Sequence, residues 1–287
     1  MANFDIHNLD VHQIEKMKHL GKADVHIHSN RSDGRPSVQE ILDWVEEKTD
    51  LDAIAITDHD NMDGYFEAVE LMKQKKYRFE LIPGEEVTSV EGHILALWIK
   101  EPIKGGLEAH TVLKKIHEQE GIAIAAHPFQ HVRVREPKYL TLDGVGLVTL
   151  LKEKDLWHGI EVLNATPTLG EENLRAAFVN RTMLLKAETG SSDAHILEAI
   201  GKGYTIFEGK TAHDLKVAIR HRQTQALYSK WNVLALFKYL FFFIPIGMRL
   251  MVYTMLHGRS KKRLQIVNVP NSTVKETFRF RDGEELK

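Results

Sequence analysis

Cysteine is absent from this sequence of 287 residues. Disulfide bonds and thiolate metal sites are therefore excluded, so any bound metal ion must be held by imidazole and carboxylate groups. A strong charge of either sign is also absent, because 38 basic and 40 acidic residues give a formal net charge of −2, which offers no general attraction for long nucleic acids. The N-terminal stretch lacks the apolar core of a signal peptide, which favours a cytoplasmic protein. The G-x-S-x-G motif of serine hydrolases is missing as well.

Apolar residues, at 43% of the chain, are frequent enough for a sizeable core. From Gly21 to about Phe207, short apolar runs alternate with stretches of helical periodicity. We expect strands at residues 23–27, 53–56, 79–82, 93–98, 122–126, 160–163, 184–188 and 204–207. Helices are expected to begin at Ser37, where Glu40 completes a capping box, and to cover residues 65–73, 112–118 and 211–221. This alternation predicts an α/β fold with a parallel sheet, open or closed into a barrel.

A strongly apolar and aromatic segment, Val233 to Leu256, follows the expected α/β domain. Lys238 and Arg249 interrupt it, and a basic cluster at residues 259–263 comes after it. We expect residues 230–263 to attach the protein to a membrane surface, in the interface or re-entrant rather than spanning. Packing on the domain or contact between two subunits is the alternative. The expected boundaries are residues 1–21 for an N-terminal extension, 22–229 for the catalytic domain and 230–287 for the apolar segment with its polar tail.

Histidine and acidic residues recur where the expected strands end. His26 and His28 are separated by one residue in the first strand, and alternation along a strand directs both imidazoles to the same side. The groups that accompany the later strands are Asp33, Asp58, His59, Asp60, Glu85, Glu86, His93, His127, Asp193 and His195. A lone histidine is usually a surface residue or a satisfied core group. So many ionisable groups at the strand ends of one domain would be costly to bury without a cation, and the pattern therefore predicts a metal site.

Several longer motifs make the sequence recognisable. In chain order they are D-V-H-I-H-S-N-R-S-D-G, I-T-D-H-D, P-G-E-E-V-T-S, G-H-I-L-A-L, A-A-H-P-F and S-S-D-A-H. With these motifs the chain resembles the PHP family, the polymerase and histidinol phosphatase domain, over about residues 22–207. The stretch G-I-E-V-L-N followed by E-N-L-R-A-A is similar to the PHP-associated C-terminal part. The resemblance implies a distorted (β/α)7 barrel, here with a C-terminal apolar appendage, and several metal ions at the carboxyl ends of the strands.

The matching motif positions imply a full set of metal ligands. Those of a first ion are His26, His28 and Asp193, with Glu86 bridging to a second ion that His93 and His127 complete, and those of a third ion are Asp33, His59 and His195. Flanking carboxylates that could orient imidazoles are Asp24, Asp58 and Asp60. Weaker candidates for phosphate binding are Arg31, Arg133 and Arg135. The mixed ligand set suits Mn, Zn or Fe, so two to three such divalent ions are the expected cofactors.

This ligand set implies a phosphoesterase. It would cleave a small phosphate monoester, or a nucleotide or oligonucleotide diester, with a metal-activated hydroxide and without a further catalytic side chain. Its partner would be a phosphorylated small molecule or a nucleotide. Two alternatives remain open, namely an exonuclease on short oligonucleotides and a non-catalytic PHP module that stabilises a larger assembly. The complete ligand set favours an enzyme over the second alternative.

Overall fold

A computed structural model of the chain describes residues 19–130 and 144–241, together with residues 244 and 248. Strands and helices alternate along it, as the sequence predicts. The first half comprises β1 (Leu20–Ile27), α2 (Val38–Lys48), β2 (Ala53–Ile56), α3 (Asp63–Gln74), β3 (Glu80–Ile82), β4 (Gly84–Thr88), β5 (His93–Leu97), α4 (Ala109–Glu118) and β6 (Ile122–Ala125). The second half comprises α5 (Gly146–Lys152), β7 (Gly159–Asn164), α6 (Gly170–Val179), β8 (Ala187–Ser191), β9 (Gly203–Glu208), α7 (Ala212–His221) and β10 (Gln225–Tyr228).

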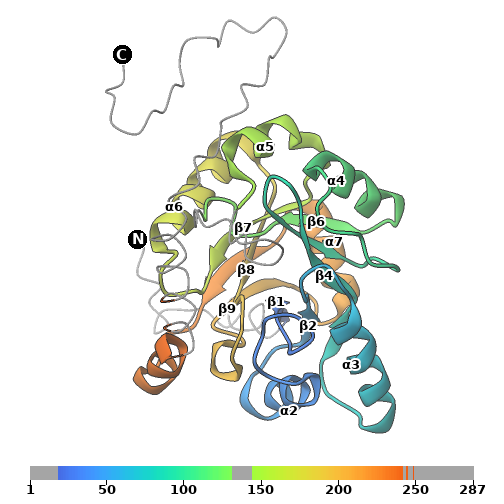
Figure 1. Cartoon of the computed structure of the whole chain (residues 1–287), viewed down its shortest axis with the longest axis vertical. Coiled ribbons are helices and arrows are strands. Elements are labelled where there is room, and N and C mark those ends of the chain that lie inside the picture. Colours follow the sequence, from blue (N-terminus) through green and yellow to red (C-terminus); the bar gives the residue numbers. More distant parts are fainter. Residues whose placement is uncertain (1–18, 131–143, 242–243, 245–247, 249–287) are drawn as a thin grey trace, which may run out of the picture.

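The strands form two five-stranded sheets, around which the helices are arranged (Figure 1). The first sheet has the order β10-β9-β1-β2-β3 and the second the order β4-β5-β6-β7-β8. Strands β1, β2 and β3 are parallel, as are β6, β7 and β8. Strands β4 and β5 pair antiparallel, as do β5 with β6 and β9 with both of its neighbours. The expected α/β fold is confirmed, whereas the expectation of a parallel sheet needs correction.

The antiparallel pairing of β4 with β5 has a simple cause in the chain. Only residues 89–92 join β4 to β5, and so short a connection cannot make the crossover that parallel neighbours need. Among the described residues, the ladders do not show a closed (β/α)7 barrel. Instead, two isolated bridges link the sheets, one between Ile27 and Ala194 and one between His59 and Glu86.

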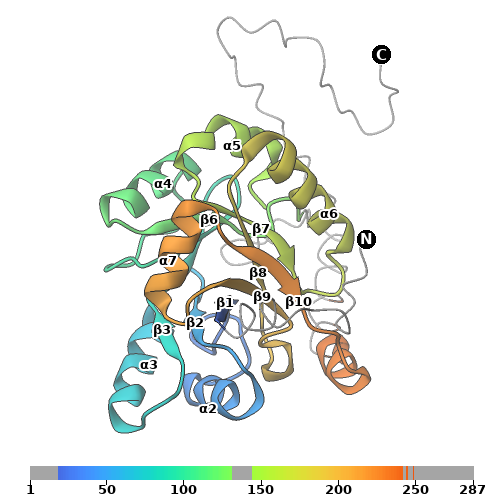
Figure 2. The same ribbon diagram turned by 180° about the vertical axis from the view of Figure 1, so that it is seen from behind.

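The core holds the two sheets and their helices together through apolar contacts. Residues of both sheets, among them Val25 and Leu95, belong to one buried cluster that also includes Leu215 and Ile219 of α7. Helix α7 packs against β3, β8 and β9 (Figure 2). A second cluster lies under α2 and a third under α4, whereas α7 packs against both sheets. Burial of these stripes supplies most of the force that positions the strand ends.

Three strands differ most from the predicted ones, and the sequence pattern does not predict one of them, β10, at all. Pro83 and Gly84 indicate only a break in the sequence, yet Gly84 begins β4, whose two glutamates obscure the apolar pattern of a buried strand. Strand β8 begins at Ala187, later than predicted, because residues 180–184 form a π-helical turn and Leu185 adopts a left-handed φ of 54°. The capping box predicted at Ser37 is present in α2, and Thr211, which begins the last predicted helix, forms a second box with Asp214 in α7.

The segment after β10 is described only in part. Residues 233–241 are helical, while the basic cluster at residues 259–263 and most of the expected N-terminal extension lie outside the described residues. Within the part of the chain that the structure describes, no helix combines the length and the apolar character needed to cross a membrane.

The cap of α7 yields a test of local stability. The Thr211 hydroxyl accepts a hydrogen bond from the backbone N–H of Asp214, whose carboxylate accepts one from the backbone N–H of Thr211. We expect Thr211→Ala to lower the free energy of unfolding by about 1 kcal/mol in urea denaturation, because a helix N–H loses its partner. Thr168→Ala, at an exposed position in a loop, is the control and should change it by less than about 0.5 kcal/mol. Equal losses in both variants would contradict the cap.

Candidate metal centre

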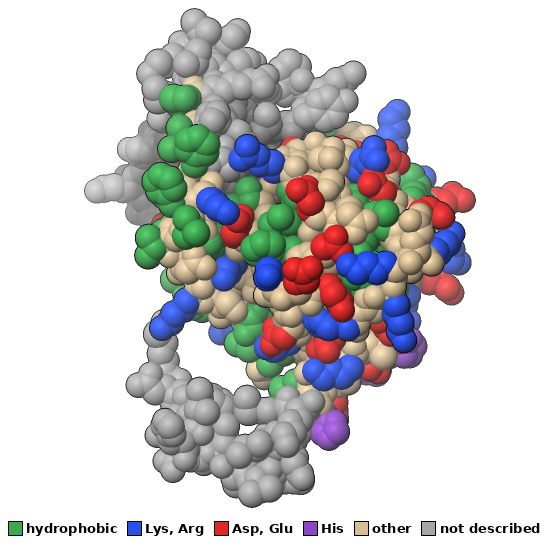
Figure 3. Space-filling model, turned by 90° about the horizontal axis from the view of Figure 1, so that it is seen from below, with side chains coloured by type: hydrophobic (Ala, Val, Ile, Leu, Met, Phe, Trp, Pro, Cys, Tyr) green, Lys and Arg blue, Asp and Glu red, His purple; other side chains and the backbone are tan. Residues whose placement is uncertain are grey.

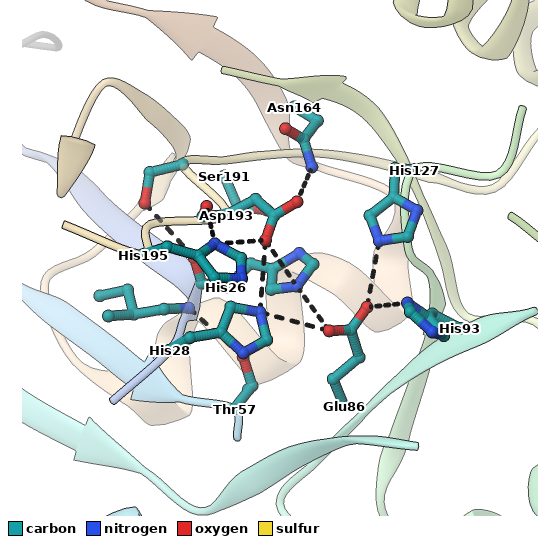
Figure 4. Close-up of polar contacts among 12 residues, drawn as sticks. His26, His28, Thr57, Glu86, His93, His127, Asn164, Ser191, Asp193 and His195 are labelled. Atoms are coloured by element: carbon teal, nitrogen blue, oxygen red, sulfur yellow. Dashed lines mark hydrogen bonds and ion pairs between the residues drawn. The ribbon is translucent and has the colours of Figure 1, made fainter. Parts of the chain in front are cut away.

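The predicted ligands gather where the two sheets meet (Figure 4). Histidines and acids that follow β1, β2, β6 and β8 reach this edge as the sequence predicts. His93 instead begins β5, but β5 is antiparallel to β6, so its first residue lies beside the last residues of β6. Glu86 reaches the same edge from β4, through the bridge to His59. The cluster therefore draws on both sheets.

The buried carboxylate of Glu86 lies at the centre of the cluster. Five imidazole nitrogens lie within 3.3 Å of its oxygens, and they belong to His26, His28, His59, His93 and His127. The first three imidazoles face Oε2, while the last two face Oε1. A carboxylate that divides its neighbours in this way has the arrangement needed to bridge two cations.

Asp193 approaches the first of these two sets from the end of β8. Its Oδ1 lies 3.2 Å from Nε2 of His28 and 3.4 Å from Nε2 of His26. Its Oδ2 accepts a hydrogen bond of 3.0 Å from the side-chain amide of Asn164. The backbone of Asp193 has a φ of 52°, in the left-handed region that most residues avoid. A strained backbone at this position is consistent with a side chain that the cluster requires.

Asp33 forms the open side of the cluster. Its Oδ2 lies 3.2 Å from Nε2 of His195 and 3.7 Å from Nε2 of His59, and its Oδ1 lies 3.6 Å from Nδ1 of His28. The Asp33 side chain is 41% exposed, whereas the Glu86 side chain is 1% exposed. Solvent therefore reaches the cluster from the side of Asp33.

The structure thus brings all nine predicted ligands together. Four subsets can each place one ligand atom per residue within 4.8 Å of the others, and they are His28 with Asp33, His59 and His195; His26 with Glu86 and His127; His26 with His28 and Asp193; and His59 with Glu86 and His93. Several buried imidazole nitrogens make no hydrogen bond, namely Nε2 of His26, both ring nitrogens of His28, and Nδ1 of His59, His93 and His127. Imidazole and carboxylate donors of this number fit divalent transition metals.

Burial and mutual charge shift the pKa values of several groups in the cluster. Burial alone would lower the pKa of His28, but its contacts with Asp193 and Glu86 outweigh burial and raise that pKa to about 10. Burial alone would raise the pKa of Glu86, but the charges of His26 and His93 hold it well below its usual range. His59 behaves in the opposite way to His28, since burial lowers its pKa to about 3. A cation that binds His28 must displace its proton, so metal affinity should increase with pH.

Glu161 is a member of the cluster that the strand-end pattern does not predict. Its Oε1 accepts hydrogen bonds from Nδ1 of His26 at 3.0 Å and from the hydroxyl of Ser191 at 2.6 Å. Its Oε2 accepts from the backbone N–H of His127 at 2.7 Å and from the Asn164 amide at 3.1 Å. By holding Nδ1, Glu161 directs Nε2 of His26 to the centre. The available signal is an acidic residue within the buried apolar strand β7.

The three flanking aspartates act on the backbone in this structure. Their carboxylates accept hydrogen bonds from N–H or hydroxyl groups, with Asp24 bonded to Ser192 and Gly201, Asp58 to Ser29 and Ser32, and Asp60 to Thr88. These bonds fix the loops that carry predicted ligands, and the expectation that the aspartates orient imidazoles stays a prediction. Burial raises the pKa of Asp24 to about 6, against the lowering effect of the hydrogen bonds it accepts.

The arginines predicted to bind phosphate receive no support from these contacts. Arg31 pairs with Glu67 through its guanidinium, with an Nη2 to Oε2 distance of 2.5 Å. Arg133 and Arg135 lie outside the described residues.

Known proteins share both sequence and fold with this chain. A family model described as PHP-associated matches residues 170–224. The uncharacterized protein MJ1587 of Methanocaldococcus jannaschii is 36% identical over 121 residues, which cover 39% of this chain and 70% of that protein.

Two solved structures show the same fold at lower identity. PsfC from Pseudomonas syringae is similar with a TM-score of 0.58 and 19% identity, over 79% of this chain and 99% of PsfC. A two-domain protein from Bacteroides vulgatus, described as containing a PHP-like metal-dependent phosphoesterase, is similar with a TM-score of 0.56 and 20% identity, over 73% of this chain and 65% of that protein. The motifs and the matching family model show that the chain contains a domain of the PHP family, and the two solved structures share its fold.

Proposed function

We propose that this protein is a metal-dependent hydrolase of phosphate esters that binds two to three divalent cations. The observation that carries the proposal is the cluster around Glu86, where buried imidazole nitrogens without hydrogen bonds converge with carboxylates. Burial of so many ionisable groups without a cation costs free energy, and coordination to divalent cations would offset that cost.

The proposed ligands are assigned to three ions. His26, His28 and Asp193 would hold the first, Glu86 with His93 and His127 the second, and Asp33 with His59 and His195 the third. The geometry supports the first and third sets directly, although His28 also adjoins the third. The ligands of the second set fall in two subsets, one of Glu86 with His93 and His59 and one of Glu86 with His127 and His26. Glu86 belongs to both subsets, in keeping with a carboxylate shared between two ions.

The surrounding residues prepare this site for a phosphate ester. Bound divalent cations lower the pKa of a coordinated water and offset the charge on phosphoryl oxygens. Glu161 keeps the hydrogen of His26 on Nδ1, which leaves Nε2 available as a ligand. Asp58 fixes the turn after β1 that carries Asp33. Because Asp33 forms the exposed side, a substrate phosphate would enter there.

The substrate proposed is a phosphorylated small molecule or a nucleotide. The formal net charge of −2 gives no general attraction for a long nucleic acid, and the guanidinium of Arg31 is already paired with Glu67. Cleavage of short oligonucleotides remains the alternative activity. A screen with p-nitrophenyl phosphate, bis(p-nitrophenyl) phosphate and a labelled short oligonucleotide separates these substrates.

Metal content provides the most direct test. We expect the purified protein to carry two to three equivalents of Mn, Fe or Zn by elemental analysis, because so many ligands exceed the needs of one ion. Removal by a chelator should lower the melting temperature and abolish hydrolysis, since bound cations stabilise the folded state. Less than one equivalent, even after Mn or Zn is supplied, would contradict the site.

Loss of a central ligand should abolish turnover while the fold survives. We expect His26→Ala, Glu86→Ala and Asp193→Ala each to lower kcat/KM by about 100-fold or more. Asp33→Ala should have a milder effect, because its side chain lies at the exposed edge. The control is His213→Ala, at an exposed position of α7, which should retain wild-type rates. A well-folded central variant with full activity would refute the assignment.

Glu161 should act through metal affinity. We expect Glu161→Gln to weaken metal binding by about 10- to 100-fold, because an amide is a poorer acceptor for the Nδ1 hydrogen of His26. Competition with a chromophoric chelator measures this affinity without reference to turnover. Glu188→Gln is a matched control, since Glu188 lies in the adjacent strand β8 but pairs with Arg181. Equal affinities in both variants would assign Glu161 a purely structural role.

A further inference from the structure

The helix at residues 233–241 is anchored beside the metal centre by one of its faces. Ala235 and Tyr239 are buried, and the ring of Trp231 packs edge-on against Tyr239. The Trp231 indole N–H donates a hydrogen bond of 3.0 Å to the carbonyl oxygen of Ala165, in the loop after β7. Lys238 forms an ion pair with Glu198, which follows the loop of predicted ligands after β8. The helix is thus fixed to the two loops that adjoin Asn164 and the Asp193 region.

The opposite face of this helix is apolar and exposed. Its side chains recur at alternating intervals of three and four residues, at Leu234, Phe237, Phe241, Ile244 and Met248, which are 54% or more exposed in every case. This spacing places them in one stripe along the helix. Seen from below, hydrophobic side chains gather along the left edge of the molecule (Figure 3). A stripe of large apolar and aromatic side chains on a helix whose other face is already packed needs a further apolar environment.

The charge of the same segment indicates what that environment is. Residues 230–263 contain seven lysines and arginines and no aspartate or glutamate. The whole chain has a formal net charge of −2, so the rest of the protein has a net negative charge while this segment has a net positive one. Apolar side chains together with flanking basic residues match the interface of an anionic bilayer, where lipid tails take up the apolar stripe and headgroup phosphates attract the cations. A protein groove would account for the stripe but not for the complete absence of acidic residues.

We propose that the exposed stripe of Leu234, Phe237, Phe241, Ile244 and Met248 binds the surface of an anionic lipid bilayer and holds the metal centre beside it. The helix would lie in the plane of the interface, because its inner face stays packed on the protein. Lys238 remains bound to Glu198 on that inner side, so the attraction to headgroups comes from the other basic residues of the segment. This binding is independent of the chemistry proposed for the centre.

Vesicle co-sedimentation of the full-length, metal-loaded protein tests the proposal. We expect binding to vesicles of phosphatidylcholine with phosphatidylglycerol, weaker binding to phosphatidylcholine alone, and a loss of binding as salt is raised. The double variant Phe237→Asp with Phe241→Asp should lower vesicle affinity by about ten-fold or more, because two charges would have to enter the apolar layer. Its melting temperature, metal content and hydrolysis of p-nitrophenyl phosphate should match wild type, since both side chains point away from the protein.

A closely matched control lies on α6. Leu174 and Phe178 are 73% and 66% exposed, compared with 67% and 64% for Phe237 and Phe241, so Leu174→Asp with Phe178→Asp makes an equivalent change elsewhere. The control should retain vesicle binding. The proposal is overturned if the wild-type protein binds neither kind of vesicle, or if the control loses as much affinity as the test variant. It is also overturned if light scattering shows a wild-type dimer that the test variant dissociates, because a second copy would then cover the face.

Discussion

The buried carboxylate of Glu86, surrounded by imidazoles, is the constraint on which the rest of this structure depends. Five histidines approach it within 3.3 Å, and they come from both sheets. A buried carboxylate and buried imidazoles stabilise one another only as a set, as the opposite pKa shifts of Glu86 and His28 show. Every strand that ends at this edge must therefore deliver its side chain accurately. The strands are short and buried, and the helices that pack on the sheets hold them in place.

Much of this arrangement could be predicted from local patterns. Strand β2 has the predicted bounds, and α2 and α7 begin at the predicted caps, because these features depend on neighbouring residues alone. The strand-end rule also selects residues that prove to lie together, since it follows from the direction of the chain in parallel strands. His93 is the instructive exception, because it reaches the edge only through the antiparallel turn of β5, which no local pattern specifies.

The features that escaped prediction depend on contacts between distant parts of the chain. Glu161 stands in a strand whose sequence reads as apolar, and its partners His26 and His127 are far away in sequence. Asp24 accepts hydrogen bonds from Ser192 and Gly201, which are far from it in sequence. Its role therefore could not be predicted from its neighbour His26. The start of β8 depends on the left-handed backbone of Leu185, a conformation that the leucine itself does not suggest.

The two isolated bridges between the sheets have a consequence for cohesion. The two sheets share one apolar cluster, and the bridges at Ile27 and at His59 pair their backbones where they meet. The cluster of predicted ligands lies beside both bridges and takes its donors from both sheets. A cation coordinated there would be bound by donors from both sheets. Separating the sheets would break this coordination, so the binding energy of the cation would oppose the separation. The proposed metal centre would then also hold the two sheets together.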